Sequence, residues 1–345
     1  MKILSLKKPY FAALDRRETE HAILFIKNFF QNELSKELNL MRITAPLFVL
    51  QNTGINDDLN GTEKPVSFFI KDNNNSQAVI VHSLAKWKRI ALANYGFNRG
   101  EGIYTDMNAI RTEEELDNIH SVYVDQWDWE MVINHEDRNL DFLKFIVKRI
   151  YAVFLKLEQE LVKKYQSIKI LLPTNIHFVH SEELEEMYPK LTPKEREDEI
   201  CKKYGAVFII GIGGNLKNGV PHDGRALDYD DWSTDTHNGF KGLNGDILVW
   251  NPVLGQAFEI SSMGIRVDKK ALNKQLELHA RQERLKLKYH TMLMNDEIPL
   301  SIGGGIGQSR LCMYFLRKAH IGEVQASIWP DAMITECANN NIFLL

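Results

Sequence analysis

Three things that the sequence lacks limit what the chain can be. Its 345 residues include only 3 cysteines, Cys201, Cys312 and Cys337, which are far apart and form no C-x-x-C pair, so neither a disulfide framework nor a zinc site is predicted. No apolar run is long enough to span a bilayer, and the N-terminus MKILSLKKPYF lacks the apolar core of a signal peptide. We therefore expect a reducing, cytoplasmic location and no membrane partner.

The chain also lacks an excess of basic residues and any linker. Its formal net charge is −4, whereas a chain that grips long nucleic acid is usually basic, so no nucleic-acid partner is expected. No internal repeat and no tract rich in Pro, Gly and Ser divides the sequence. The 44% hydrophobic and 26% charged residues are typical of a globular protein. We predict a single domain over residues 1–345, with residues 1–18 as an N-terminal extension.

Two glycine clusters fail the familiar tests for phosphate-binding motifs. In SIGGGIGQSR (301–310), Gln308 occupies the position of the third glycine of a dinucleotide-binding turn, and no Gly-Lys-Ser/Thr closes a P-loop. GIGGNLKNG (211–219) fails in the same way, with Leu216 at that position. Taken alone, both clusters favour tight turns or close packing over phosphate binding.

The order of expected elements favours an α+β fold. Hydrophobic periodicity predicts helices over 19–38 and 140–164. Thr192 and Glu195 form a capping box that begins a helix ending near Gly205, and a last long helix is expected to start near Asp268. The strands do not alternate regularly with helices, which indicates an antiparallel or mixed sheet flanked by helices. Strands are expected at 41–46, 65–70, 77–83, 120–129, 168–173, 176–181, 205–213, 245–252 and 256–267.

One expected strand carries a polar pair on an otherwise apolar face. In the stretch after His120, side chains alternate, so that Gln126 and Asp128 share a face with Val122 and Val124. Burying such a pair without partners is costly, which suggests a ligand. A sheet that is exposed to solvent on this side is the alternative.

Three charged stretches have competing interpretations. VHSLAKWKR (81–89) favours a solvated face, or a tryptophan covered by lysine stems, over an anion site. The acidic loop DYDDWSTD (228–235) lacks EF-hand spacing, and most of its charges are expected to be solvated. Asp246 and Glu259 lie on successive strands and are either paired ligands for Mg²⁺ or isolated acids at strand ends.

The motifs in their order along the chain resemble those of class II aminoacyl-tRNA synthetases. A long helix and a strand ending at Pro46 resemble motif 1. Arg111, an acidic loop and the strand with Gln126 and Asp128 resemble motif 2 in its aspartyl version, and GGGIGQSRLCMYFL resembles motif 3, with Arg310 at the start of a helix. Ser83 and Lys88, and likewise Glu259 and Arg266, have the spacings of substrate-binding segments of aspartyl-tRNA synthetases.

From about residue 19 onward, the sequence resembles one family on that fold more closely, the ammonia-dependent asparagine synthetases. HSLAKWKR, HSVYVDQWDWE, DYDDWST, LNGDILVWNPV, SSMGIR and IGGGIGQSR all look like signatures of this family. Ser309 stands where the tRNA synthetases often carry an acidic residue, and it suits the asparagine synthetases. No anticodon-binding domain is visible, and no N-terminal cysteine is present to act on glutamine, so free ammonia is the expected nitrogen source.

The resemblance implies a reaction and roles in it for particular residues. Aspartate would attack the α-phosphate of ATP to give β-aspartyl-AMP and pyrophosphate, and ammonia would then displace AMP to give asparagine. Arg111 would hold the α-phosphate, Arg310 the distal phosphates and the adenine, and Arg225 the nucleotide. Asp246 and Glu259 would bind Mg²⁺, and both also belong to the implied nucleotide site.

The implied aspartate site recognises two kinds of charge. Ser83, Lys88 and Arg266 are assigned to the anionic end of aspartate, with Ser262 as a further contact. Gln126, Asp128 and Asp230 are assigned to its amino group. Asp57, in NDDLNG, would attract ammonium or take its proton, because only the deprotonated nitrogen is nucleophilic. The residues expected to act in catalysis are Asp57, Lys88, Arg111 and Arg310.

The family resemblance also implies a partner, and it leaves two alternatives open. Class II folds usually dimerise through motif 1, and the stripe of Ile23, Ile26, Phe30 and Leu34 on the first helix offers an apolar face for a homodimer. One alternative is a synthetase that charges tRNA, which shares all three motifs. The other is a non-catalytic module, which is disfavoured because Arg111, Asp246, Glu259 and Arg310 are all present.

Overall fold

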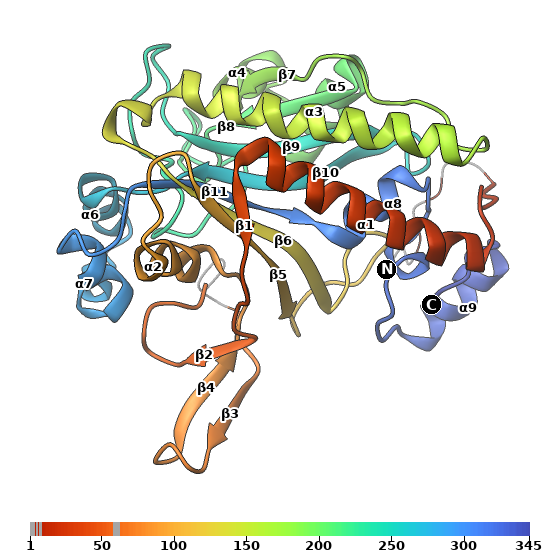
Figure 1. Cartoon of the computed structure of the whole chain (residues 1–345). Coiled ribbons are helices and arrows are strands. Elements are labelled where there is room, and N and C mark those ends of the chain that lie inside the picture. Colours follow the sequence, from red (N-terminus) through yellow and green to blue (C-terminus); the bar gives the residue numbers. More distant parts are fainter. Residues whose placement is uncertain (1–3, 5, 7–8, 58–62) are drawn as a thin grey trace.

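The chain is built around one large twisted sheet, seen in a computed structural model that describes residues 4, 6, 9–57 and 63–345 (Figure 1). Eight strands follow one another in the order β1-β5-β6-β11-β10-β9-β8-β7. β1 pairs with β5 and β7 with β8 in parallel, and the other neighbours are antiparallel. The strands are β1 (Leu40–Arg42), β5 (Gly102–Ile110), β6 (Tyr123–Val132), β7 (His177–His180), β8 (Ala206–Ile210), β9 (Asn244–Asn251), β10 (Gln256–Ile265) and β11 (Ser301–Gly307). The prediction of a mixed sheet flanked by helices in an α+β fold is confirmed.

Two long helices lie side by side over one face of the sheet (Figure 1). α1 (Arg16–Leu38) begins three residues earlier than expected, because Asp15 and Glu18 form a capping box, and α3 (Leu140–Lys164) has its expected bounds. The Phe30 ring of α1 lies 4.9 Å from that of Trp127 on β6. Trp127 and Trp129 point into this core, so the alternate side chains of β6 point to the opposite face.

The opposite face is covered at its two ends. α2 (Ala85–Tyr95) packs on β5, β6 and β11, and α5 (Pro193–Tyr204) packs on β8, β9 and β10. The Thr192 capping box that begins α5 is confirmed. The other helices are α4 (Ser181–Met187), α6 (Lys269–Leu278), α7 (Lys288–Met294), α8 (Gln308–Phe315), α9 (Asp331–Asn339), η1 (His135–Asp137), η2 (Gln282–Lys286) and η3 (Ile321–Glu323).

Four expectations about local structure are wrong. Residues 168–173 form no strand, because the backbone N–H groups of Leu171 and Leu172 donate to the carboxylate of Glu158, 3.0 Å away in each case. The strand expected at 41–46 ends at Arg42. The helix expected near Asp268 does start there, with Asp268 as its N-cap, but it is short and stops at Leu278, before a left-handed residue, Ala280, at φ 51°. Finally, the glycine cluster at 301–307 is the strand β11 and not a turn.

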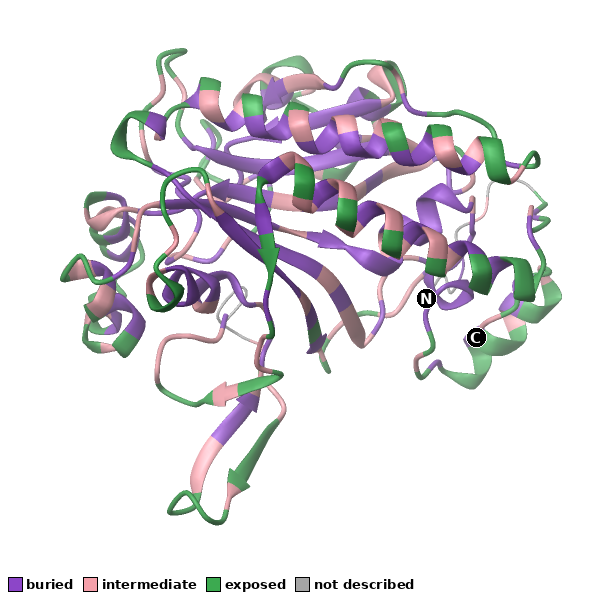
Figure 2. Cartoon of the chain, viewed as in Figure 1, coloured by how far each residue is buried: buried purple, intermediate pink, exposed green. Residues whose placement is uncertain are grey.

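A small sheet projects from the body of the molecule (Figure 1). It has the order β2-β4-β3, with β2 (Phe48–Leu50), β3 (Ser67–Ile70) and β4 (Ser76–Ile80). Much of β2 and β3 is exposed, including Phe48 and Phe69 (Figure 2). Among the helices that the structure describes, none is long and apolar enough to cross a membrane.

Candidate active site

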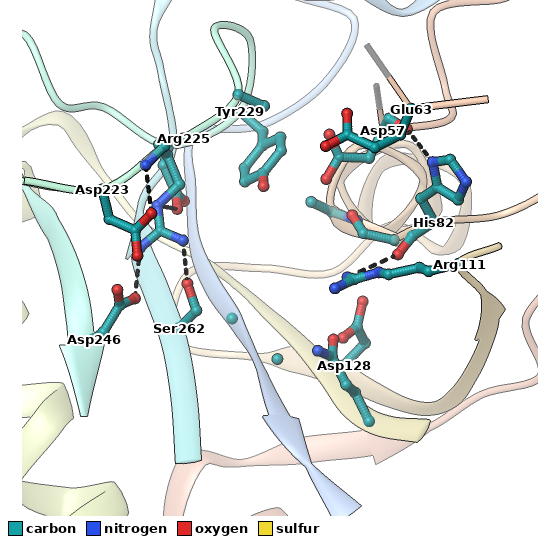
Figure 3. A pocket seen from close by; sticks show the side chains of 18 of the residues that line it. Asp57, Glu63, His82, Arg111, Asp128, Asp223, Arg225, Tyr229, Asp246 and Ser262 are labelled. Carbon is teal, nitrogen blue, oxygen red and sulfur yellow. Dashed lines mark hydrogen bonds and ion pairs between the residues drawn. The ribbon is translucent and has the colours of Figure 1, made fainter. Parts of the chain in front are cut away.

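A cavity of about 380 Å³ opens on the sheet face opposite α1 and α3 (Figure 3). Its walls come from β6, β9, β10 and β11, from the start of α2 and the two residues before Leu84, and from described residues between β2 and β3, β5 and β6, and β8 and β9. Arg310 instead lines an adjoining cavity of about 210 Å³, which shares Arg111, Gln126 and Glu259 with the first. The first cavity brings together all the other residues expected from the sequence: Asp57, Ser83, Lys88, Arg111, Gln126, Asp128, Arg225, Asp230, Asp246, Glu259, Ser262 and Arg266.

The glycine strand β11 makes room for the polar side chains of β6. A Cβ atom on Gly303 would collide with the Glu130 carboxylate, and one on Gly305 would collide with Gln126 and Asp128. On the opposite face, a Cβ atom on Gly304 would lie 2.6 Å from Cβ of Met263. Strands rarely carry consecutive glycines, because these weaken the strand. Here the missing side chains let neighbouring groups lie directly against the backbone of β11, so the structure supports the interpretation of close packing.

At one end of the cavity, buried charges pair with one another. We call Lys88, Asp128, Glu130, Asp230 and Arg266 the anchor cluster. The Arg266 guanidinium donates to Glu130 from Nε (3.0 Å) and Nη2 (2.9 Å) and to Asp230 from Nη1. All five residues are at most 2% exposed. Three carboxylates face two cations, so the cluster carries one negative charge in excess, which suits a ligand with an ammonium group.

Lys88 holds the anchor cluster to the sheet. Its ammonium donates to the carbonyl oxygens of Trp129 and Gly304, 3.0 Å away in each case, and lies 3.3 Å from the Asp128 carboxylate. Burial lowers the pKa of Lys88, although Asp128 and Glu130 act in the opposite direction. For Glu130, burial opposes ionisation, but Arg266 and Lys88 outweigh it and lower the pKa of its carboxyl. The start of α2 contributes as well, since the Leu84 N–H donates to Asp128 over 3.3 Å.

The other end of the cavity is richer in arginine and less fully paired. We call Arg111, Arg225, Asp246, Glu259 and Arg310 the nucleotide end. Arg111 donates from Nη2 to the carbonyl oxygen of His82 over 3.3 Å, and its buried Nε has no hydrogen-bond partner in the described part of the chain. Three cations face two carboxylates, which leaves one positive charge in excess. A polyphosphate suits this balance.

Asp246 and Glu259 project from neighbouring strands to the same side. In the register, Asp246 pairs with Ser262, and Leu248, two residues on, pairs with Glu259. Burial raises the pKa of Asp246 to about 6, with Arg225 acting in the opposite direction and Glu259 adding to the rise. For Glu259, burial is outweighed by Arg310, Lys194 and Arg225, which lower its pKa. Two adjacent carboxylates that line the cavity are an oxygen donor set that fits Mg²⁺.

Two arginines already contact these carboxylates. Arg225 donates from Nη2 to Asp246 and from Nη1 to Ser262, both over 2.5 Å. Arg310, at the start of α8, lies 3.5 Å from the Glu259 carboxylate, with its guanidinium over the Phe258 ring at 5.9 Å. In the residues that the structure describes, no group of three or more His, Cys, Asp or Glu side chains gathers to bind a metal.

Two charged stretches expected in solvent are buried. In 81–89, Lys86, Lys88 and Arg89 are each 1% exposed, and in 228–235, Asp228 and Asp231 are fully buried. The two stretches meet, because Lys86 lies 3.1 Å from Asp228. Both expectations were wrong for one reason: each segment was judged alone, and its countercharges are far away in the sequence.

Glu130 and Tyr229 are two residues of the site that the sequence analysis did not assign. Glu130 lies behind the cavity wall, where it pairs with Arg266. It alternates with Gln126 and Asp128 and so shares their face, and extending the strand pattern by two residues would have found it. Tyr229 lines the cavity itself. It lies within the acidic loop, and nothing in its local sequence pattern distinguishes it.

Comparison with known proteins identifies the relatives of the chain. The family model described as aspartate-ammonia ligase matches residues 17–341. Aspartate–ammonia ligases from Bacteroides thetaiotaomicron and Clostridium perfringens are 60% and 56% identical to the chain, and each alignment covers all of both chains.

Solved structures support the same fold at low identity. Asparaginyl-tRNA synthetase from Pyrococcus horikoshii, solved with asparaginyl-adenylate, matches with a TM-score of 0.66 at 15% identity, over 91% of this chain and 70% of that one. Aspartyl-tRNA synthetase from Entamoeba histolytica matches with a TM-score of 0.61 at 15% identity, over 89% of this chain but only 58% of that longer chain. The prediction of a class II synthetase-like fold is confirmed.

Proposed function

Because the chain belongs to the aspartate–ammonia ligase family, we propose that the cavity carries out that family's reaction in two half-reactions. The protein is a ligase that makes asparagine from aspartate and ammonia with ATP as co-substrate, and the alternative of a tRNA-charging enzyme is not favoured. Aspartate first forms β-aspartyl-AMP and releases pyrophosphate, and ammonia then displaces AMP. The observation that carries this proposal is the opposite excess charge at the two ends of one cavity.

We assign the anchor cluster to aspartate. Asp128 and Asp230 have lone pairs for the α-ammonium group, together with the amide oxygen of Gln126. Arg266 and the Ser83 hydroxyl supply donors for the α-carboxylate, and Ser262 completes this site near Arg225. Lys88 adds positive charge beside the carboxylate, while its own N–H groups stay bonded to the protein. Since these groups are held in place before the substrate arrives, they orient its free β-carboxylate towards the nucleotide end.

We assign the nucleotide end to ATP. The planar guanidinium of Arg111, with its unpaired Nε, would take oxygens of the α-phosphate as charge builds on them. Arg225 would assist Arg111, and Arg310, in the adjoining cavity, would hold the distal phosphates and the adenine. Asp246 and Glu259 would hold Mg²⁺, which when bound offsets charge on the polyphosphate.

We assign Asp57 to the nitrogen substrate. It is 1% exposed and lines the cavity on the side away from Asp246 (Figure 3). A carboxylate there attracts ammonium and accepts its proton, which yields the nucleophilic form. Asp57→Asn is expected to spare the exchange of pyrophosphate into ATP more than it spares asparagine formation. Equal losses of the two activities would contradict this assignment.

One incubation tests the overall reaction. The protein is mixed with ATP, Mg²⁺ and aspartate, ammonium or glutamine is added in turn, and asparagine and AMP are measured. We expect both products with ammonium and little asparagine with glutamine. A failure to form asparagine with ammonium would overturn the proposed function.

We also propose a cytoplasmic homodimer. The three cysteines are free thiols buried in the fold, which supports a reducing location. The expected dimer face on α1 is largely unavailable, because Ile26, Phe30 and Leu34 are fully buried within the chain. The dimer contact is therefore assigned to β1, an edge strand on which Met41 is 50% exposed, with Phe48 of β2 nearby in the sequence. Met41→Glu is expected to shift the mass measured by light scattering from dimer to monomer.

A further inference from the structure

The side-chain hydroxyl of Tyr229 faces the cavity. In Figure 3 it lies between Arg225 and Asp57, and its hydroxyl points into the cavity. Among the described residues, none forms a hydrogen bond with this hydroxyl. The backbone is held in place, because the Tyr229 carbonyl oxygen accepts from the Val267 N–H over 2.8 Å. The Arg266 guanidinium lies 5.6 Å from the centre of the ring and fixes it against the anchor cluster. A hydroxyl held in this way is available to a ligand.

The chemistry around this hydroxyl suits a small cation. Burial raises the pKa of Tyr229 well above its usual value, and the carboxylates of Asp57 and Asp230 raise it further, while Arg225 and Arg266 act in the opposite direction. The phenol therefore stays neutral and keeps lone pairs that accept hydrogen bonds. An ammonium ion donates four hydrogen bonds and accepts none. A phenol oxygen and a carboxylate facing the same space offer acceptors to it, and the ring adds a negative π face.

We propose that Tyr229 and Asp57 together form the subsite for the nitrogen nucleophile, with the Tyr229 hydroxyl oxygen accepting one N–H of ammonium. This inference rests on the proposed function and adds to it a residue that binds the second substrate. Ammonium gives one proton to Asp57, and the lone pair left on nitrogen forms a bond to the β-carbonyl carbon of β-aspartyl-AMP. The bond from that carbon to the phosphate oxygen then breaks, AMP leaves with its electron pair, and nitrogen releases a second proton to solvent as the amide forms.

Tyr229→Phe tests the hydroxyl without removing the ring. With saturating ATP and aspartate, the KM for ammonium is expected to rise about tenfold, the value of a hydrogen bond to a charged group. Aspartate-dependent exchange of pyrophosphate into ATP should stay within about twofold of wild type. The matched control is Tyr151→Phe, which removes a tyrosine hydroxyl bonded to the Pro173 carbonyl oxygen, outside the cavity. It should change neither quantity.

Hydroxylamine separates binding of the cation from the later steps. It is uncharged near neutral pH and attacks the same acyl carbon to give the hydroxamate. Tyr229→Phe should therefore impair ammonium more than hydroxylamine. Combined with Asp57→Asn, its effect on kcat/KM for ammonium should be less than additive, because both residues act on one ion.

Each outcome has one meaning. An unchanged KM for ammonium in Tyr229→Phe would overturn the inference, as would equal losses with ammonium and hydroxylamine. A parallel loss of pyrophosphate exchange would also overturn it, because Tyr229 would then serve aspartate or ATP. If wild-type protein shows no aspartate-dependent exchange at all, the proposed function has failed independently of Tyr229.

Discussion

The two ends of the cavity differ in how completely their charged side chains are buried and paired. In the anchor cluster, every charged group is at most 2% exposed and already pairs with another member. At the nucleotide end, only Arg225 and Asp246 form a short pair among the described residues, at 2.5 Å. The side chains of Arg310 and Glu259 are 21% and 38% exposed and their ion pair is 3.5 Å long. The charged groups of the anchor cluster are paired before a ligand binds, whereas those of the nucleotide end depend on the ligand for part of their pairing.

This difference follows from the two substrates. Aspartate is small and of nearly fixed shape, so a prebuilt set of partners selects it at little cost in ordering. ATP is large and highly charged, so arginines held firmly by protein carboxylates would be unavailable to its phosphates. We therefore expect substitutions at the anchor cluster to reduce stability and substitutions at the nucleotide end to reduce catalysis.

The largest effect is expected from Arg111→Ala. The loss of a guanidinium that stabilises charge on a transferring phosphate typically costs about 10³-fold or more in rate. Aspartate-dependent exchange of pyrophosphate into ATP should become undetectable. The free energy of unfolding should change by less than about 1 kcal/mol, because the Arg111 side chain makes one weak hydrogen bond to the described residues. Exchange at the wild-type rate would show that the assignment to the α-phosphate is wrong.

Glu130→Ala should show the opposite pattern. It would leave Arg266 and Lys88 buried with one carboxylate fewer, and breaking a buried pair costs about 3–5 kcal/mol in unfolding free energy. Urea unfolding followed by circular dichroism measures this loss. Glu37→Ala is the matched control, because Glu37 pairs with Arg149 at the surface, and it should cost less than about 1 kcal/mol. Similar losses of unfolding free energy in the two variants would show that the anchor cluster contributes no more to stability than a surface ion pair.

Asp246→Asn should stabilise the protein in a pH-dependent way. The pKa of Asp246 is about 6 in the folded chain against an ordinary 3.8, so the folded chain holds the proton more tightly than the unfolded chain does. The ionised carboxylate therefore lowers the unfolding free energy as pH rises from about 4 to about 6, and the penalty persists above that range. At about pH 8 the variant should be about 1–3 kcal/mol more stable than wild type. Denaturant unfolding across this range measures the gap, and a gap independent of pH would contradict the prediction.

The smallest effect on stability is expected from Glu259→Gln. Its pair with Arg310 is long and partly exposed, and such pairs contribute less than about 1 kcal/mol. The melting temperature should therefore hardly move, while asparagine formation should fall. A large loss of stability would place Glu259 with the anchor cluster instead.

Sequence patterns correctly predicted those features of the structure that depend on a single segment of the chain. The heptad-like spacing of α3 gave its bounds, and the Thr192 capping box gave the start of α5. The alternation in β6 put Gln126 and Asp128 on one face. The order of the class II motifs predicted which distant residues share the cavity, and hydrophobic periodicity cannot predict this.

The failures share a physical cause, which is interaction between distant segments. Leu171 and Leu172 look like strand residues, but their N–H groups are taken by Glu158 of α3. Lys86 looks solvated until Asp228 is seen beside it. Tyr229 interacts with Asp57 and Arg266, which lie far from it in the chain.

The glycine strand β11 also has a consequence for the order of folding. Glycine loses more backbone freedom than any other residue when it becomes ordered, so β11 gains little from pairing with one neighbour alone. It lies between β6 and β10, and β6 comes much earlier in the chain. We therefore expect the core beneath α1 and α3 to become ordered early in folding, and β11 to pair with its neighbours late. The empty space that admits the substrates is then among the last parts of the molecule to take shape.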